Sequence, residues 1–122
     1  MQTDFDRWLA AQFAETGPFT IFIVLVRIAG VSVSAVKSSY AHVVGDDMNW
    51  PEMCALLDRA RTPWDGVAFF IGLGDAGGPL PDGLARGKLK EVEASVVADP
   101  LALNRGLFFD RLGRHLQINE VT

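Results

Sequence analysis

Residues 18–36 read PFTIFIVLVRIAGVSVSAV, a nearly continuous apolar run in which Arg27 is the only charged residue. The part from Phe19 to Ile28 is rich in Ile and Val, which is typical of a central strand covered on both faces. After Gly30, valine and alanine alternate with serine, and this period of two predicts a second strand with one apolar face. We therefore predict an antiparallel hairpin here rather than one membrane-spanning helix.

Apolar periodicity and turn residues outside this hairpin predict three main helices and further strands. The Thr3–Asp6 spacing resembles a capping box before a helix over about residues 4–15. Asn49 is expected to cap a second helix that ends before Thr62, and Asp82 to cap a third. The remaining predicted elements are strands at 40–44 and 66–71, a helical turn from Asp99, and a hairpin within 107–118 with Gly113 in a left-handed conformation.

This order of elements predicts an α+β fold, with a mainly antiparallel sheet, three main helices packed on it and a C-terminal β-hairpin. A three-layer α/β arrangement is the alternative. No linker is long enough to split the chain, so residues 1–122 are expected to form a single domain.

Composition narrows the classes of function. The net charge of −4 argues against nucleic-acid binding, which needs clustered Lys and Arg. The single cysteine, Cys54, cannot form an intramolecular disulfide, so we expect a cytoplasmic protein. Asp4 and Asp6 stand where a signal peptide would be positively charged, and we expect no signal peptide and no membrane partner.

The stretch FFIGLGDAGGPLP at residues 69–81 has the G-x-G-x-x-G spacing of dinucleotide-binding loops. In such loops a helix begins within the glycine motif, and its amides bind the pyrophosphate. Here Pro79 and Pro81 follow instead and remove amide donors. A flexible connection is therefore the favoured interpretation. A ligand-binding site is the alternative, and its residues would be Arg27, Gly72, Gly74, Asp75 and Gly77.

Arg27 is unusual because it lies within the most apolar predicted strand. An unpaired buried guanidinium would cost several kcal/mol. We expect Arg27 to emerge at the end of the strand; pairing with a carboxylate and lining a pocket are the alternatives.

Two residue pairs resemble catalytic pairs. Cys54 and His42 can serve as nucleophile and base, but Cys54 lies on the apolar stripe of its helix and is expected in the core. His115 is expected opposite Asp110 across the terminal turn, as a surface pair.

Metal binding has little support in the sequence. The two histidines and one cysteine have no zinc-site spacing. Asp46 and Asp47 can join Asp65 or Asp75 around a magnesium ion, or His42 in a metal-dependent hydrolase, but acidic residues at turns need no metal to explain them. We expect no cofactor and no metal.

No motif identifies a family, and no coherent catalytic set is present. The favoured hypothesis is a non-enzymatic interaction or regulatory module that forms a homodimer or binds a protein partner through an edge strand or the terminal hairpin. Trp64, expected to be partly exposed, and Phe108 and Phe109 are the expected interface residues. A small-molecule or nucleotide-binding domain or enzyme that uses the loop at 72–78 is the alternative.

Overall fold

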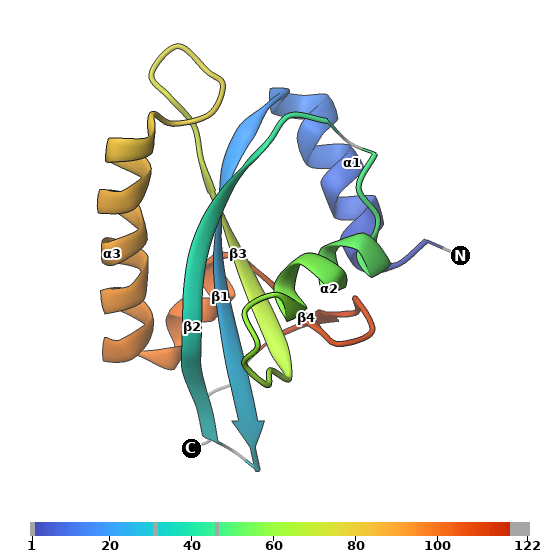
Figure 1. Ribbon diagram of the computed structural model, residues 1–122, viewed down its shortest axis with the longest axis vertical. Coiled ribbons are helices and arrows are strands. Elements are labelled where there is room, and N and C mark those ends of the chain that lie inside the picture. The colour runs from blue at the N-terminus through green and yellow to red at the C-terminus, as the bar shows by residue number, and fades with distance from the viewer. Residues whose placement is uncertain (1, 31, 46, 118–122) are drawn as a thin grey trace.

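A computed structural model describes residues 2–30, 32–45 and 47–117 (Figure 1). The strands form one five-stranded antiparallel sheet in the order β2-β1-β3-β4-β5. The predicted α+β class is confirmed. In chain order the elements are α1 (Asp4–Thr16), β1 (Phe19–Ala29), β2 (Ser32–Val43), α2 (Trp50–Asp58), β3 (Gly66–Gly72), α3 (Asp82–Ala98), the 3-10 helix η1 (Pro100–Arg105), β4 (Leu107–Asp110) and β5 (His115–Leu116).

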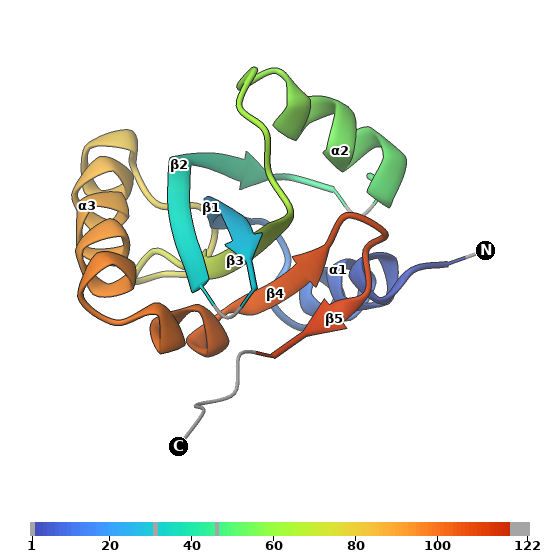
Figure 2. The ribbon, with the colours of Figure 1, turned by 90° about the horizontal axis from the view of Figure 1, so that it is seen from below.

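Helices cover both faces of the sheet. Figures 1 and 2 show α1 and α2 on one side, and α3 followed by η1 on the other. β1 contributes to both cores because successive side chains of a strand point to opposite faces. Its residues Phe19–Val26 are all buried, as the continuous apolar run predicts. The members of the α1/α2 core include Phe5, Ile21, Ile23, Leu25, Trp50 and Phe109, and those of the α3 core include Val24, Val26, Val96, Leu103 and Phe108.

The predicted hairpin is present, but β2 is longer than the sequence suggested. It pairs with β1 from Ser32 opposite Ala29 to Val43 opposite Phe19, so the separate strand predicted at 40–44 is the second half of β2. The register shifts between Leu25, which faces Lys37, and Val26, which faces Ala35. This leaves an extra residue at position 36, a β-bulge.

Helix caps join distant elements. The predicted capping box of α1 is confirmed, since the Asp6 amide donates to Thr3 Oγ1 at 3.1 Å and the Thr3 amide to Asp6 Oδ2 at 2.9 Å. The other oxygen of Asp6 accepts from the Trp50 amide at 2.8 Å and links α1 to α2. The predicted cap of α3 is wrong: Pro81 is the N-cap, without a side-chain hydrogen bond, and the Asp82 carboxylate binds His42 instead.

The predicted C-terminal hairpin is also present. Phe108 pairs with Leu116 and Phe109 with His115, and Gly113 has a φ of 76° in the turn between β4 and β5. No helix in the described part of the chain is both long and apolar enough to span a lipid bilayer.

Candidate functional site

Arg27 lies at the exposed end of β1, as expected, and also pairs with a carboxylate. Its Nε lies 3.1 Å from Asp65 Oδ2, and the same oxygen accepts from the Ile28 amide at 2.7 Å. The Ile28 hydrogen bond first, and the guanidinium second, hold the pKa of Asp65 below its ordinary value. The pair is solvent-exposed, so it contributes little to stability.

Arg27 also lines a shallow pocket of about 240 Å³ with Trp64, Asp58 and Arg111. Arg111 lies over the Trp64 ring, 4.0 Å from its centroid, and donates to Asp58 Oδ1 at 3.2 Å. Trp64 donates to the same oxygen at 3.0 Å, and these two hydrogen bonds lower the pKa of Asp58. Each guanidinium already faces a carboxylate, so the pocket has no uncompensated positive charge with which to attract an anion.

The glycine loop lies at the opposite end of β3 from Arg27. Gly72 is opposite Thr20 in the register, whereas Gly66 is opposite Val26. The structure therefore does not bring Arg27 together with Gly72, Gly74, Asp75 and Gly77.

The loop uses several of its amides internally. Gly74 donates to the Gly78 carbonyl and Gly77 to the Gly74 carbonyl, each at 2.9 Å. The Leu80 amide donates to Thr20 Oγ1 at 2.8 Å. Amides engaged in this way do not converge on a phosphate, and this arrangement favours the structural interpretation of the loop.

The expected interface aromatics are buried within the chain itself. Trp64 is 5% exposed, Phe108 2% and Phe109 1%. The expectation that Trp64 is partly exposed is wrong, because its ring packs in the α1/α2 core beneath Arg111. Phe108 and Phe109 point to opposite faces of β4, and each face is covered by its own core. The three residues are therefore not available as surface contacts.

Neither of the two residue pairs that resemble catalytic pairs in the sequence forms in the structure. Cys54 packs against the α1/α2 core from a half-buried position, and burial raises the pKa of its thiol, which favours the unreactive protonated form. Asp110 pairs with Arg114, at 2.7 Å from its Nε, rather than with His115. The His115 amide donates instead to Asp4 Oδ2 at 2.9 Å.

His42 belongs to a polar network that the sequence analysis missed. Its Nδ1 lies 2.9 Å from Thr20 Oγ1 and its Nε2 lies 2.8 Å from Asp82 Oδ1. An ionised carboxylate only accepts, so Nε2 donates to Asp82 and, in the neutral ring, Nδ1 accepts from the Thr20 hydroxyl. The hydrogen bond from His42 is the main reason that the pKa of Asp82 is lowered. The available sequence signal was a threonine within an otherwise apolar buried run.

The Thr20–His42–Asp82 network resembles a hydrolase triad in its residue types, but Thr20 has no exposed surface. Its oxygen also accepts from the Leu80 amide, so no space adjoins it for a substrate carbonyl. The network instead connects β1, β2, the glycine loop and the start of α3.

Metal ligands do not converge in the described ranges, where no group of three or more His, Cys, Asp or Glu side chains is placed to hold an ion. Asp46, one of the predicted ligands, lies outside the described residues. Asp65 pairs with Arg27 and His42 with Asp82, so these two predicted ligands lie in separate clusters.

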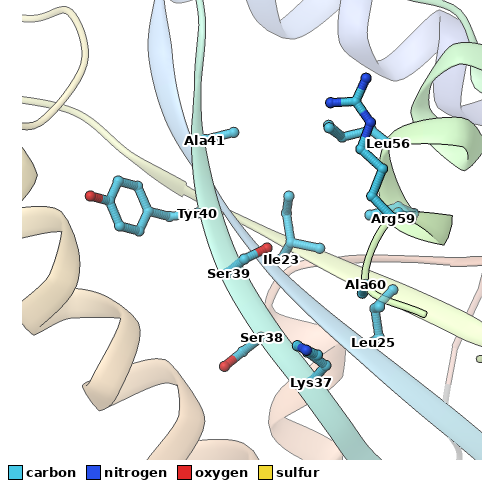
Figure 3. A pocket seen from close by; sticks show the side chains of 11 residues that line it. Ile23, Leu25, Lys37, Ser38, Ser39, Tyr40, Ala41, Leu56, Arg59 and Ala60 are labelled. Atoms are coloured by element: carbon cyan, nitrogen blue, oxygen red, sulfur yellow. The ribbon is translucent and has the colours of Figure 1, made fainter. Parts of the chain in front are cut away.

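The outer edge of β2 and the groove beside it are the remaining candidate site. β2 is a 12-residue strand at one margin of the sheet, and no other described segment pairs with its outer edge. A pocket of about 300 Å³ lies between β2 and α2 (Figure 3). It is lined by Ile23 and Leu25 of β1, by residues 37–41 of β2, and by Leu56, Leu57, Arg59 and Ala60.

Comparisons with models of protein families, with curated proteins and with solved structures find no match.

Proposed function

We propose that this chain is a cytosolic, non-enzymatic interaction module that self-associates through the outer edge of β2. The observation that supports the proposal is the length of that edge. β2 has 12 residues, Ser32–Val43, of which all but Val36 of the bulge pair with β1, and no described segment pairs with its other side. Unpaired backbone N–H and C=O groups on an edge strand are a template for pairing with another strand. The opposite edge, β5, has only two residues.

The surroundings of this edge suit an added strand. Figure 2 shows β2 at the margin of the sheet, between α3 and α2. One hollow lies on the α2 side, and a second, of about 180 Å³, lies on the α3 side between Val24, Val36 and Val97. Side chains of an added strand alternate between the two faces, so they would enter the two hollows in turn.

The two halves of β2 differ in how well they suit pairing. The first half carries the bulge and Lys37, and bulges and lysines both discourage edge-to-edge contact. The second half, residues 38–43, is regularly paired with β1. We therefore place the contact on residues 38–43, with the two copies antiparallel about a two-fold axis, so that their Lys37 side chains stay apart.

The test compares the same added charge at the two edges of the sheet. Ser39→Lys places a cation on the exposed second half of β2, and Leu112→Lys places one in the β4–β5 turn, where Leu112 is 63% exposed. We expect multi-angle light scattering to give a dimer for the wild type and Leu112→Lys, and a monomer for Ser39→Lys.

A monomeric wild-type protein at concentrations of about 100 μM would contradict self-association, because any dimer would then be weaker than about 5.5 kcal/mol of binding free energy. Loss of the dimer in Leu112→Lys but not in Ser39→Lys would place the contact on the terminal hairpin instead.

A further inference from the structure

The groove between β2 and α2 is longer than one pocket. The pocket of about 300 Å³ adjoins a second of about 220 Å³, and Ala41 and Leu56 line both. The first extends toward Leu25 and Ala60, and the second toward Val43 and Met48. These two adjoining pockets are together called the α2–β2 groove.

The sequence of β2 explains why the groove is open. Ser39 and Ala41 are opposite Ile23 and Ile21 in the register, and opposed residues of paired strands share a face. The isoleucines of β1 are fully packed in the core, but serine and alanine are too small to fill the space beneath α2. The groove therefore has an apolar floor and a shallow wall on the β2 side.

Charges are distributed unequally along the groove. Lys37 on β2 and Arg59 after the last residue of α2 line the first pocket from opposite walls (Figure 3). Neither has an ion-pair partner among the described residues, whereas Arg7, Arg27, Arg111 and Arg114 each pair with an aspartate. Asp47 lines the far pocket. One end is thus cationic and the other carries an acid.

We propose that the α2–β2 groove binds an unbranched aliphatic carboxylate. The alkyl chain lies over the half-buried apolar residues of the groove, Ala41, Leu56 and Ala60, where it removes apolar surface from water. The carboxylate lies in the first pocket, where Lys37 and Arg59 supply the positive charge, and Asp47 in the second pocket disfavours the reverse orientation. The two pocket volumes, about 300 and 220 Å³, lie at and below the lower end of the range for small-molecule sites, which suits a single medium-length chain.

Isothermal titration with three probes tests the charge and the chain separately. Decanoate supplies both groups, decyltrimethylammonium keeps the chain but reverses the charge, and acetate keeps only the carboxylate. We expect decanoate to bind at least about tenfold more tightly than the cation, and acetate not to bind. Equal binding of the two decyl compounds, or no binding of decanoate below its micelle concentration, would overturn the proposal.

A filled groove provides the second test. Ala41→Leu puts a larger side chain at the residue shared by both pockets, and we expect decanoate binding to be lost. The matched control is Ala35→Leu, which adds the same atoms to β2 on the α3 side of the sheet. Should Ala41→Leu not fold by circular dichroism, Ser39→Leu fills the first pocket from an exposed position. Unchanged binding in the folded variant would exclude the groove.

Charge reversal tests the two cations. In the Lys37→Glu/Arg59→Glu variant we expect the preference to invert, so that the decyl cation binds more tightly than decanoate. An unchanged preference would contradict the proposal. If decanoate does not bind and Ala41→Leu turns a dimer into a monomer, the occupant of the groove is a second copy of the chain instead.

Discussion

Thr20 shows how a single polar residue organises this interior. Its side chain has no exposed surface, yet its hydroxyl accepts a hydrogen bond from the Leu80 amide and lies within hydrogen-bonding distance of His42 Nδ1. The buried hydroxyl is therefore fully hydrogen-bonded. His42 in turn binds Asp82, the first residue of α3. Because an unpaired buried polar group costs about 1–3 kcal/mol, the network holds the glycine loop against β1.

The Thr20–His42–Asp82 network makes a prediction about pH. The pKa of Asp82 in the folded chain is lowered from 3.8, mainly by the hydrogen bond from His42. A carboxylate whose pKa is lower in the folded than in the unfolded chain stabilises the fold at pH values above its unfolded-state pKa. This stabilisation is lost as the pH falls through the folded-state pKa. We expect Asp82→Asn to be less stable than the wild type at about pH 7, and the difference to shrink below about pH 4.

Urea unfolding followed by tryptophan fluorescence across this pH range measures the effect. The matched control repeats the substitution in a His42→Ala background, where the donor is absent and the pH dependence of the difference should largely disappear. A difference between Asp82→Asn and wild type that stays constant with pH would show that His42 does not act through the charge of Asp82. Asp4, Asp58 and Asp65, whose pKa values are also lowered, are present in every variant.

At the scale of elements, β2 has two neighbours that use different faces of it. His42 and Tyr40 reach Asp82 on the α3 side, with Nε2–Oδ1 and OH–Oδ1 distances of 2.8 and 3.4 Å. On the opposite face of β2, the small side chains of Ser39 and Ala41 line the groove beneath α2. The outer edge between these faces is unpaired within the described chain, so β2 can add a strand without losing either set of contacts.

Two glycines in different elements should respond oppositely to alanine. A Cβ at Gly106, between η1 and β4, would overlap the Phe69 carbonyl oxygen and lie 2.9 Å from a ring carbon of Phe70. At Gly87, within α3, no described atom apart from the neighbouring helix backbone lies within 4 Å of a Cβ. We expect Gly106→Ala to lower the free energy of unfolding by about 1–3 kcal/mol, and Gly87→Ala to raise it by about 0.5–1 kcal/mol.

Chemical denaturation of the two variants beside the wild type gives both values. Equal effects at the two positions would mean that the loss of backbone entropy dominates, and that the close approach of β3 at Gly106 is relaxed at little cost.

At the scale of the whole molecule, one sheet separates two cores. The α1/α2 core contains most of the aromatic side chains, with Phe5 in contact with Trp8, Trp50, Phe69 and Phe109 at ring-centroid distances from 5.1 to 5.8 Å. The α3 core is built from smaller residues with Phe108. β4 contributes adjacent phenylalanines to both, so the terminal hairpin completes the two cores at once.

Substitution of Phe108 should therefore test folding rather than association. We expect Phe108→Ala to lower the free energy of unfolding by about 3–5 kcal/mol, because it leaves a cavity in the α3 core. Leu112→Ala, on the exposed turn of the same hairpin, should change it by less than about 0.5 kcal/mol. Denaturation curves measure both changes in the free energy of unfolding. A Phe108→Ala variant with wild-type stability that fails to form the proposed dimer would instead support Phe108 as an interface residue.

Local patterns in the sequence predicted most of the fold. The β1–β2 hairpin, the α1 cap at Thr3 and the turn at Gly113 depend on neighbouring residues, so periodicity and turn chemistry were sufficient. The cap of α3 was predicted wrongly because Asp82 has two uses, and the choice of His42 depends on a residue 40 positions away.

The candidate sites were less predictable. Phe108 and Phe109 were expected at the surface because adjacent aromatics exceed what one face of a hairpin can bury, but the sheet has a covered face on each side. Trp64 was expected to be partly exposed because it lies between Pro63 and Asp65 ahead of a strand, but its ring packs in the α1/α2 core. Arg27 and the glycine loop were grouped as one candidate site. The antiparallel register of β1 and β3 puts Arg27 near the first residue of β3, whereas the loop begins at its last residue. No sequence pattern predicted the groove, because it results from the small side chains of Ser39 and Ala41 lying beneath α2, and only the tertiary structure places this helix over them.

By itself, the sequence determined which segments become strands and helices, because those preferences arise from residues within one or two turns of each other. Only the tertiary structure decided that β2 is an edge, that Thr20 meets His42 and Asp82, and that a groove with cations at one end lies beside α2. These features depend on strand order and helix placement, which are set by the burial of both faces of one sheet and not by any local pattern.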